Sequence, residues 1–367
     1  MPNKKIAILG AAGVPANYGG FETLAENLVR YHDVASPEDQ LTVYCSSKNY
    51  PIKKQAFLSA RLKYVPLNAN GAQSILYDIF SLLSAVWSRN DEILLLGVSG
   101  AIALPIVRVV SHARIITNID GIEWRRLKWR GIAKHFLRFS EKIAVRFSHE
   151  VITDNEVITD YVRHAYGVDC HMIAYGGDHA VAADAVAISD HVLPAKYAFS
   201  VCRIEPENNV YMIVEAFSRL RSHALIMVGN WDYSDYGRAI REQFGSFANL
   251  YLLDPIYDLG QLKTLRSQAM FYVHGHCAGG TNPSLVEAMH FALPVLAFDC
   301  GFNRSTAEDK ALFFGSSEEL VRLVETTTAS DIEKVGRDML EIARRRYTWS
   351  AIAEQYFALL NGFDGMQ

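Results

Sequence analysis

The sequence predicts an α/β protein with two doubly wound, Rossmann-like domains, each built around a parallel sheet. Short runs rich in Val, Ile and Leu recur between helical stretches, which is the pattern of strand–helix–strand units. The chain has 367 residues, more than one hydrophobic core usually supports. We therefore expect a first domain over residues 1–178 and a second, with its linker, over residues 179–348, while residues 349–367 pack back on the first.

The expected strands follow from these apolar runs. Those of the first half are Ile6–Gly10, Leu41–Cys45, Leu62–Val65, Ile93–Gly97, Arg114–Thr117, Glu150–Thr153 and His171–Ala174. A stretch dominated by Ala, Val and Asp, residues 178–194, has no clear period and is expected to link the domains. The strands beyond it are Tyr197–Val201, Leu225–Gly229, Leu250–Leu253, Met270–His274 and Val295–Phe298. The last helix, Trp349–Leu360, carries an apolar stripe and needs a hydrophobic surface to cover.

Composition and charge exclude several classes of protein. A net charge of -4 gives no general attraction to nucleic acid. The five cysteines are widely spread and contain no C-x-x-C pair, so we expect neither a disulfide framework nor a zinc knuckle. The apolar run before Gly10 is too short for a signal peptide, and Ile93–Val107 falls short of the roughly 20 residues of a membrane span. A cytoplasmic protein is expected.

A glycine-rich loop after the strand at Met270–His274 opens a helix. Asn282 is a good N-cap and Pro283 suits the first helical position. Such a helix start directs backbone amides at an anion, so the loop has the chemistry of a diphosphate cradle built from Gly280, Thr281, Asn282, Ser284 and Leu285. One turn further, Glu287 is placed to accept hydrogen bonds from vicinal hydroxyls such as those of a ribose. The alternative is an ordinary capped helix with an exposed glutamate.

A second glycine-rich loop, Gly10–Thr23, connects the first strand to a helix. Its spacing is not G-x-G-x-x-G, and the second strand ends in Cys45-Ser46-Ser47 without an acidic ribose-binding residue, so a dinucleotide site is disfavoured. A third segment, Asn118–Trp129, begins at the carboxyl end of a strand, where open α/β sheets bind ligands. Asp120 in this segment can orient or partly deprotonate a hydroxyl, or can simply cap the next helix.

The segment that follows is strongly basic. Between Glu123 and Phe147 lie eight basic residues and two acidic ones, with Trp124, Trp129, Phe136 and Phe139 interleaved. This is the pattern of a helix that rests on anionic lipid. A merely solvated basic face is the alternative.

The loop around Glu287, together with Ala292-Leu293-Pro294-Val295, resembles the donor-site signature of retaining GT-B glycosyltransferases of family four. The resemblance implies the GT-B fold, in which two Rossmann-like domains face a central cleft. It implies a ribose-binding role for Glu287, while Gly279 stands where the family has a first glutamate. It also implies that Arg203 neutralises the donor diphosphate and that Asn208 stands where a lysine is expected.

The same resemblance implies further roles. Ile256 and Tyr257 would frame the nucleobase, a plain turn being the alternative. His274 and His276, which share one face of a strand, would line the donor cleft. A metal at these histidines lacks a third ligand at suitable spacing, so none is expected. Gly19 and Gly20 would lie beside the donor phosphates and the acceptor. The remaining acceptor-side residues are Asn17, Tyr18, Asp120, Glu123 and Trp124, with Asp120 standing where many relatives have a histidine.

Three motifs together resemble one subgroup, the bacterial rhamnosyltransferases of capsule and exopolysaccharide assembly. They are Ala-Asn-Tyr-Gly-Gly-Phe-Glu-Thr, Asp-Gly-x-Glu-Trp-x-Arg-x-Lys-Trp and Gly-Gly-Thr-Asn-Pro-Ser-Leu. The resemblance implies transfer of L-rhamnose from dTDP-L-rhamnose, with retention and without a cofactor. The basic helix, if it rests on anionic lipid, would bring a lipid-linked saccharide acceptor within reach at the inner face of the membrane. Two rival hypotheses are an NAD(P)-dependent sugar-modifying oxidoreductase and a non-catalytic sugar-nucleotide binding protein.

Overall fold

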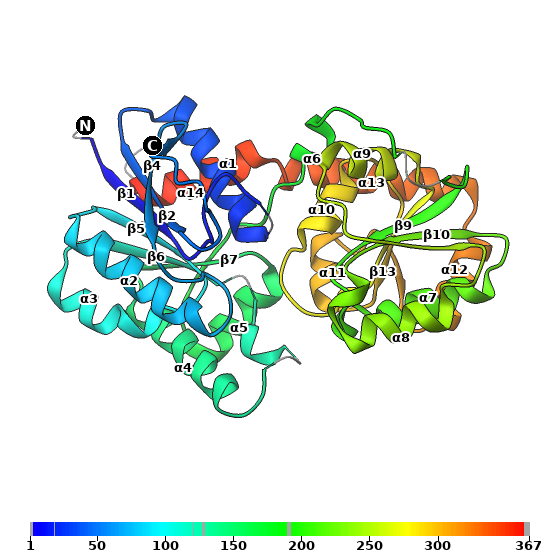
Figure 1. Ribbon diagram of the computed structural model, residues 1–367, viewed down its shortest axis with the longest axis horizontal. Helices are drawn as coiled ribbons and strands as arrows, with labels where there is room; N and C mark the ends of the chain where they lie inside the picture. Colours follow the sequence, from blue (N-terminus) through cyan, green and yellow to red (C-terminus); the bar gives the residue numbers. More distant parts are fainter. Residues whose placement is uncertain (1–2, 18, 120, 127–128, 189–191, 363–367) are drawn as a thin grey trace. The chain divides into compact units, whose positions relative to one another are not determined.

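The structure is a computed structural model that describes residues 3–17, 19–119, 121–126, 129–188 and 192–362. The chain divides into two compact units, Met1–Ala174 with Ser350–Gln367, and Tyr175–Trp349. Each unit contains one parallel β-sheet with helices on both faces (Figure 1). The predicted fold class of two doubly wound α/β domains is confirmed.

The sheet of the N-terminal unit has the strand order β3-β4-β2-β1-β5-β6-β7-β8. All neighbours are parallel except β3 and β4. The strands are β1 (Lys5–Leu9), β2 (Gln40–Ser46), β3 (Ala56–Phe57), β4 (Ala60–Val65), β5 (Glu92–Leu96), β6 (Arg114–Ile119), β7 (Glu150–Thr153) and β8 (His171–Met172). The helices are α1 (Gly20–Ala35), α2 (Ser74–Trp87), α3 (Leu104–Val110), α4 (Gly131–Phe147), α5 (Glu156–Tyr166) and α14 (Trp349–Asn361).

The sheet of the C-terminal unit is entirely parallel, in the order β11-β10-β9-β12-β13-β14. Its strands are β9 (Tyr197–Val201), β10 (Ala224–Val228), β11 (Leu250–Leu253), β12 (Phe271–His274), β13 (Val295–Phe298) and β14 (Leu312–Phe314). The helices are α6 (His179–Ala182), α7 (Val210–Arg219), α8 (Asp235–Phe244), α9 (Leu259–Gln268), α10 (Pro283–Met289), α11 (Gly301–Thr306), α12 (Ser317–Thr326) and α13 (Ala329–Arg346). The sequence did not predict the short strand β14 or helix α6.

Burial explains why the strands read as unbroken apolar runs. Every residue of β5 is buried, and in β1 only Lys5 at the start is exposed. A parallel sheet covered on both faces removes both sets of alternating side chains from water, which requires apolar residues at nearly every position. The apolar segment Ile93–Val107 accordingly forms β5, a turn and the start of α3, and none of the described helices is long and apolar enough to cross a membrane.

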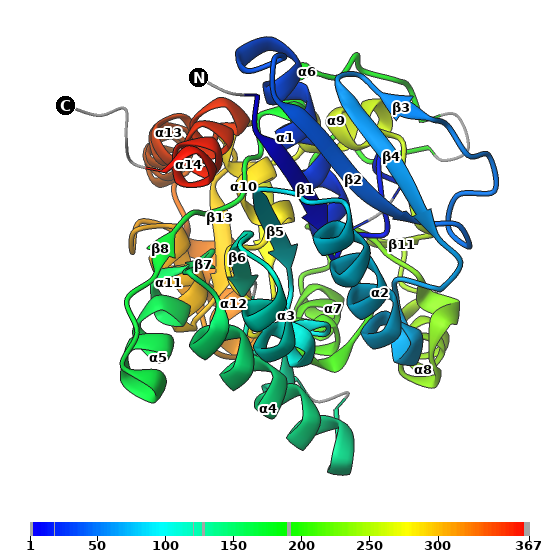
Figure 2. The same ribbon diagram turned by 90° about the vertical axis from the view of Figure 1, so that its left-hand side faces the viewer.

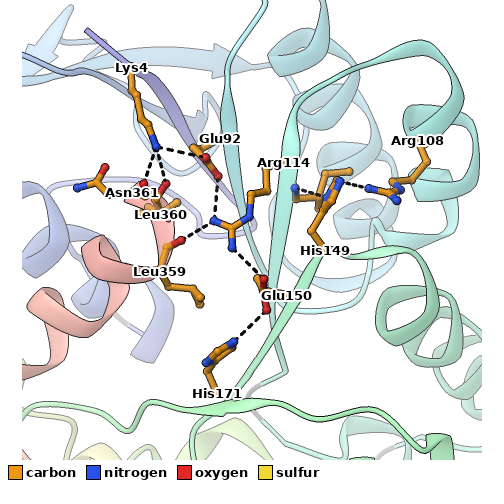
Figure 3. Close-up of polar contacts among 11 residues, drawn as sticks. Lys4, Glu92, Arg108, Arg114, His149, Glu150, His171, Leu359, Leu360 and Asn361 are labelled. Atoms are coloured by element: carbon orange, nitrogen blue, oxygen red, sulfur yellow. Dashed lines mark hydrogen bonds and ion pairs between the residues drawn. The ribbon is translucent and has the colours of Figure 1, made fainter. Parts of the chain in front are cut away.

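Helix α14 belongs to the N-terminal unit and is joined to it by polar contacts (Figure 3). Lys4 donates to the carbonyl oxygens of Leu360 (3.3 Å) and Asn361 (3.0 Å), and Arg114 donates to that of Leu359 (2.5 Å). These carbonyls lie in the last turn of the helix, where the regular hydrogen-bond pattern ends, and the two cations bond to them and complement the negative end of the helix dipole. Helix α14 is thereby fixed to Lys4, directly before β1, and to Arg114 of β6.

Candidate functional site

The glycine-rich loop after β12 leads into α10 with the expected cap. The Asn282 side chain accepts hydrogen bonds from the backbone N–H of Ser284 (3.1 Å) and from its hydroxyl (2.8 Å). Pro283 is the first helical residue. Gly279 has a φ of 113°, a conformation that a residue with a side chain adopts only under strain. The backbone at this position therefore favours the glycine that replaces the glutamate of the resembled family.

Glu287 of α10 lies in a polar network that holds its carboxylate in one place. Oε2 accepts a hydrogen bond from the guanidinium of Arg266, and Oε1 lies 3.4 Å from Nε2 of His179. The indole N–H of Trp349 donates to Nδ1 of His179 (2.9 Å), so the imidazole carries its proton on Nε2, facing the carboxylate. The order Trp349, His179, Glu287 is a chain of hydrogen bonds that orients the carboxylate from one side.

The pKa of Glu287 reflects this network. Burial alone raises the pKa of the carboxyl group, but the charge of Arg266 and the hydrogen bond from His179 outweigh it, so the pKa lies below its ordinary value. The side chain of Arg266 is only 1% exposed, whereas 15% of the Glu287 side chain is open. Each carboxylate oxygen has one further lone pair available, which leaves room for two hydroxyl donors.

Arg203 and Asn208, both in the loop after β9, differ in exposure. Arg203 is exposed, with its guanidinium 3.9 Å from the Glu205 carboxylate. Asn208 is buried, and its side-chain amide donates to the backbone carbonyl of Arg203 (2.7 Å). Asn208 therefore shapes the loop that presents Arg203, and Arg203 carries the accessible positive charge of this segment.

His274, the last residue of β12, stacks on His276. The rings of His274 and His276 have centroids 4.4 Å apart and are nearly parallel. His274 is buried, which holds its pKa well below the ordinary value and keeps it neutral. Neither of its ring nitrogens has a hydrogen-bond partner among the described residues. No group of three or more described His, Cys, Asp or Glu side chains is arranged to hold a metal ion.

The two residues that are predicted to contact the nucleobase follow β11. Ile256 is partly buried, whereas Tyr257 is 62% exposed. Both lie in the loop before α9, and Asp258 of the same loop caps that helix by accepting from the backbone N–H of Gln261 (2.8 Å). A flat exposed ring beside a fixed loop is suited to stacking against a planar base.

In the N-terminal unit, the loop between β1 and α1 is built over a buried carboxylate. Glu22 accepts a hydrogen bond from the backbone N–H of Ala12 (2.8 Å), and burial raises its pKa. Gly19 has a φ of 127°, and a Cβ there would lie 2.0 Å from Oε2 of Glu22. Gly20 begins α1 and Asn17 is exposed. Tyr18 lies outside the described residues.

Side chains within the segment after β6 form hydrogen bonds and an ion pair with one another. Glu123 accepts from the indole N–H of Trp129 (2.8 Å) and pairs with Arg126 (3.5 Å). The Trp124 indole N–H instead points at Glu141 of α4 (3.3 Å). Asp120, the predicted acceptor-side carboxylate, lies outside the described residues. Glu123 thus contacts two residues of its own segment, and its acceptor-side role stays a prediction.

Comparison with known proteins identifies the architecture. Residues 184–346 match the family model "Glycosyl transferases group 1", and residues 3–178 match a "Domain of unknown function" (DUF1972). A sucrose-phosphate synthase from Thermosynechococcus elongatus superposes with a TM-score of 0.80, at 15% identity over 98% of both chains. The chain has the GT-B fold. The group 1 match in its C-terminal half supports a glycosyltransferase.

Two other solved structures agree with this fold. HepE of Anabaena, in complex with UDP and glucose, has a TM-score of 0.71 at 15% identity, over 98% of this chain and 100% of that chain. A glycosyltransferase from Rickettsia africae has a TM-score of 0.75 at 12% identity, over 98% of both chains. No curated protein matches the sequence.

Sequence reasoning missed Arg266, His179 and Glu22 as parts of these sites. Arg266 stands in α9, where the sequence contains no recognisable motif, and His179 stands in the segment that was expected to link the domains. A buried arginine requires an anion nearby, but its burial cannot be read from a local pattern. Glu22 belongs to the motif Ala-Asn-Tyr-Gly-Gly-Phe-Glu-Thr, and its place in the first turn of α1 is the signal that could have marked it.

Proposed function

We propose that the protein transfers L-rhamnose from dTDP-L-rhamnose, with retention of configuration, to a lipid-linked saccharide in cell-surface polysaccharide synthesis. The observation that carries this proposal is the fixed carboxylate of Glu287, one turn beyond a capped helix start that follows a glycine loop. This arrangement offers amides to a diphosphate and a carboxylate to a ribose. The choice of dTDP and rhamnose rests on the resemblance of the three sequence motifs.

In this proposal, Arg203 stabilises the departing diphosphate. The bond between C1 of the sugar and the diphosphate oxygen breaks while the acceptor oxygen bonds to C1 on the same face. The acceptor proton passes to the departing phosphate oxygen, so no protein nucleophile is required. The exposed guanidinium of Arg203 is suited to this role, because negative charge grows on the leaving group in the transition state. Asp120 would orient the acceptor hydroxyl.

An acceptor anchored in lipid requires contact with a membrane, for which α2, α3 and α4 are suited. Helix α3 packs on α4, and α2 and α4 both contact the short helix at Ala101–Ala103 (Figure 2). The acidic residues of the three helices are Asp78 and Glu141, and both are buried. Large apolar side chains are exposed on α2 at Leu76, Phe80, Leu83 and Trp87, on α3 at Ile106, Val109 and Val110, and on α4 at Ile132 and Phe139. An exposed apolar surface without acidic side chains favours an anionic bilayer.

Ligand-induced stabilisation tests the donor assignment. The purified chain is heated with dTDP, UDP, GDP, NADH or NADPH, and we expect dTDP to raise the unfolding temperature most. A ligand at 100 times its Kd adds about 2.7 kcal/mol to the free energy of unfolding. Stronger stabilisation by UDP would contradict the base assignment, and stabilisation only by a dinucleotide would favour an oxidoreductase.

A product assay tests catalysis separately. With dTDP-L-rhamnose and a lipid-linked saccharide, we expect release of dTDP and a glycoside with the anomeric configuration of the donor. Activity should persist in EDTA, because the proposed chemistry uses no metal. Binding of dTDP without hydrolysis or transfer would favour a non-catalytic binding protein.

A further inference from the structure

The N-terminal unit contains a cavity that the donor chemistry does not use. Its volume is about 670 Å³, and it is lined by residues of the short helix Glu123–Arg125, of α4 and of α5. The side chains that matter for its chemistry are three aromatic rings, Trp124, Tyr161 and Tyr166, and three permanent cations, Arg125, Arg138 and Lys142. All of them lie in the segment that matches the domain of unknown function.

The cations gather on aromatic faces. The guanidinium carbon of Arg125 lies 5.2 Å from the centre of the Trp124 ring and 4.9 Å from that of Tyr161. Arg138 lies 5.1 Å from the same indole, and the ammonium of Lys134 lies 5.6 Å from it. Such contacts hold a cation in place without neutralising it. Across the part of the chain that the structure describes, no acidic side chain forms an ion pair with Arg125, Lys134, Arg138 or Lys142.

One carboxylate lies beneath these rings. Glu141 is buried, and its Oε1 accepts hydrogen bonds from the hydroxyls of Tyr161 and Tyr166, both at 2.6 Å, and from the Trp124 indole at 3.3 Å. Burial and the neighbouring Glu141 raise the pKa of both tyrosines, so they keep their protons and remain donors. Glu141 therefore positions the aromatic walls, and its single negative charge balances only part of the positive charge around it.

We propose that this cavity binds a phosphate or diphosphate ester, with Arg125, Arg138 and Lys142 as its cationic contacts. Positive charge held in a recess by aromatic rings and left without acidic partners is complementary to a dense oxyanion. The recess is large enough for a diphosphate and a group attached to it. The inference deepens the proposed function, because a lipid-linked saccharide carries such an ester. The headgroup of an anionic lipid carries the same chemistry.

The test measures binding of inorganic pyrophosphate to the full chain by calorimetry, with saturating dTDP present so that the donor site is filled. The double variant Arg138→Gln/Lys142→Gln should weaken this binding about tenfold or more, since two charge-assisted contacts are lost. Arg146→Gln is the matched control, because Arg146 is exposed on α4 but does not line the cavity. Unchanged pyrophosphate affinity in the double variant, or an equal loss in the control, would overturn the proposal.

A second variant acts in the opposite direction. Glu141→Gln keeps an oxygen that accepts from the rings but removes the buried negative charge, so pyrophosphate should bind several-fold more tightly. Weaker or unchanged binding in a folded Glu141→Gln protein would also overturn the proposal. If dTDP fails to bind the wild type, the proposed donor is wrong. Pyrophosphate binding is then measured in the Arg203→Ala variant, in which the donor site has lost its cation for the diphosphate.

Two further probes identify the source of the ester. A short-chain prenyl diphosphate that binds more tightly than glycerol 3-phosphate, with both affinities dependent on Arg138 and Lys142, supports the diphosphate of a lipid-linked acceptor. Equal affinity for the two supports a lipid headgroup. If the affinities for both probes do not depend on these two cations, the cavity is not a phosphate site.

Discussion

Each unit holds one carboxylate in a polar network, Glu287 largely buried and Glu141 fully buried, and the two networks differ. In the C-terminal unit, Glu287 is paired with a buried arginine and a histidine. In the N-terminal unit, Glu141 accepts its hydrogen bonds from two phenols and an indole, while the nearby cations stack on the rings of these donors. The first arrangement uses positive charge to fix a carboxylate. The second leaves positive charge available at the surface.

The difference bears on what each region can bind. A carboxylate already held by Arg266 and His179 has a defined orientation, which suits hydrogen bonding to a neutral partner such as a sugar hydroxyl. Cations that lack acidic partners attract an anion, and their positions do not need to be exact. The comparison thus associates the C-terminal site with precise recognition and the cavity near α4 with anion capture.

Removal of Arg266 should have the largest effect. Arg266→Met leaves the largely buried Glu287 carboxylate without its cation, and breaking a buried pair in this way costs about 3–5 kcal/mol. Chemical denaturation measures the loss. Arg219→Met is the matched control, because Arg219 forms ion pairs at an exposed position, where the contribution to stability is small. Equal losses in both variants would show that Arg266 and Glu287 are not a buried pair.

Loss of Arg203 should be next in size. Arg203→Ala removes a charge-assisted contact of roughly 1.5–3 kcal/mol, which corresponds to about a 10- to 150-fold decrease in kcat/KM for transfer. Its fold should be unaffected, because Arg203 is exposed. Steady-state kinetics and a melting curve on the same preparation separate the two effects. Unchanged kcat/KM would remove Arg203 from the site.

The pH dependence of stability sharpens the contrast further. The pKa of Glu287 is lower in the folded than in the unfolded chain, so its contribution is fully present above its ordinary value of 4.5 and is lost as the pH falls through the folded pKa. Glu287→Gln should abolish this part of the acid-induced loss of stability. Glu242→Gln, at an exposed position of α8, should leave it intact. Identical pH profiles for the wild type and Glu287→Gln would contradict the pairing.

Single substitutions on the helices that are proposed to contact the membrane should have the smallest effects. Replacing Lys134 and Arg146 with Gln should weaken binding to anionic vesicles by about 1 kcal/mol per residue, and high salt should mimic the effect. Trp87→Ser should also weaken binding, because the side chain is 90% exposed, whereas Tyr233→Ser, at a 76% exposed site of the C-terminal unit, should not. Vesicle co-sedimentation measures both. If vesicle binding changes neither with salt nor with any of the three substitutions on α2 and α4, the exposed apolar side chains of these helices have no role in membrane binding.

The sequence by itself determined the fold class. Apolar runs between helical segments indicated both parallel sheets, because a strand covered on both faces must be apolar along its whole length. The cap of α10 was also predictable, since Asn282 and Pro283 act on groups within two residues of themselves. These features are local, so a local pattern contains them. The short strand β14, at the edge of its sheet, has too few residues to form such a pattern.

Only the tertiary structure decided the partners of Glu287 and Glu141. Trp349 contacts His179 across 170 positions of the chain, and Arg266 reaches Glu287 across 21. Likewise, the basic residues of α4 were visible in the sequence, but the cavity they line needs Tyr161 and Tyr166 from α5. Which distant groups meet depends on how whole helices pack against the sheets. Burial then decides whether a charge must be paired, because an ion that loses its water needs a partner and an exposed one does not.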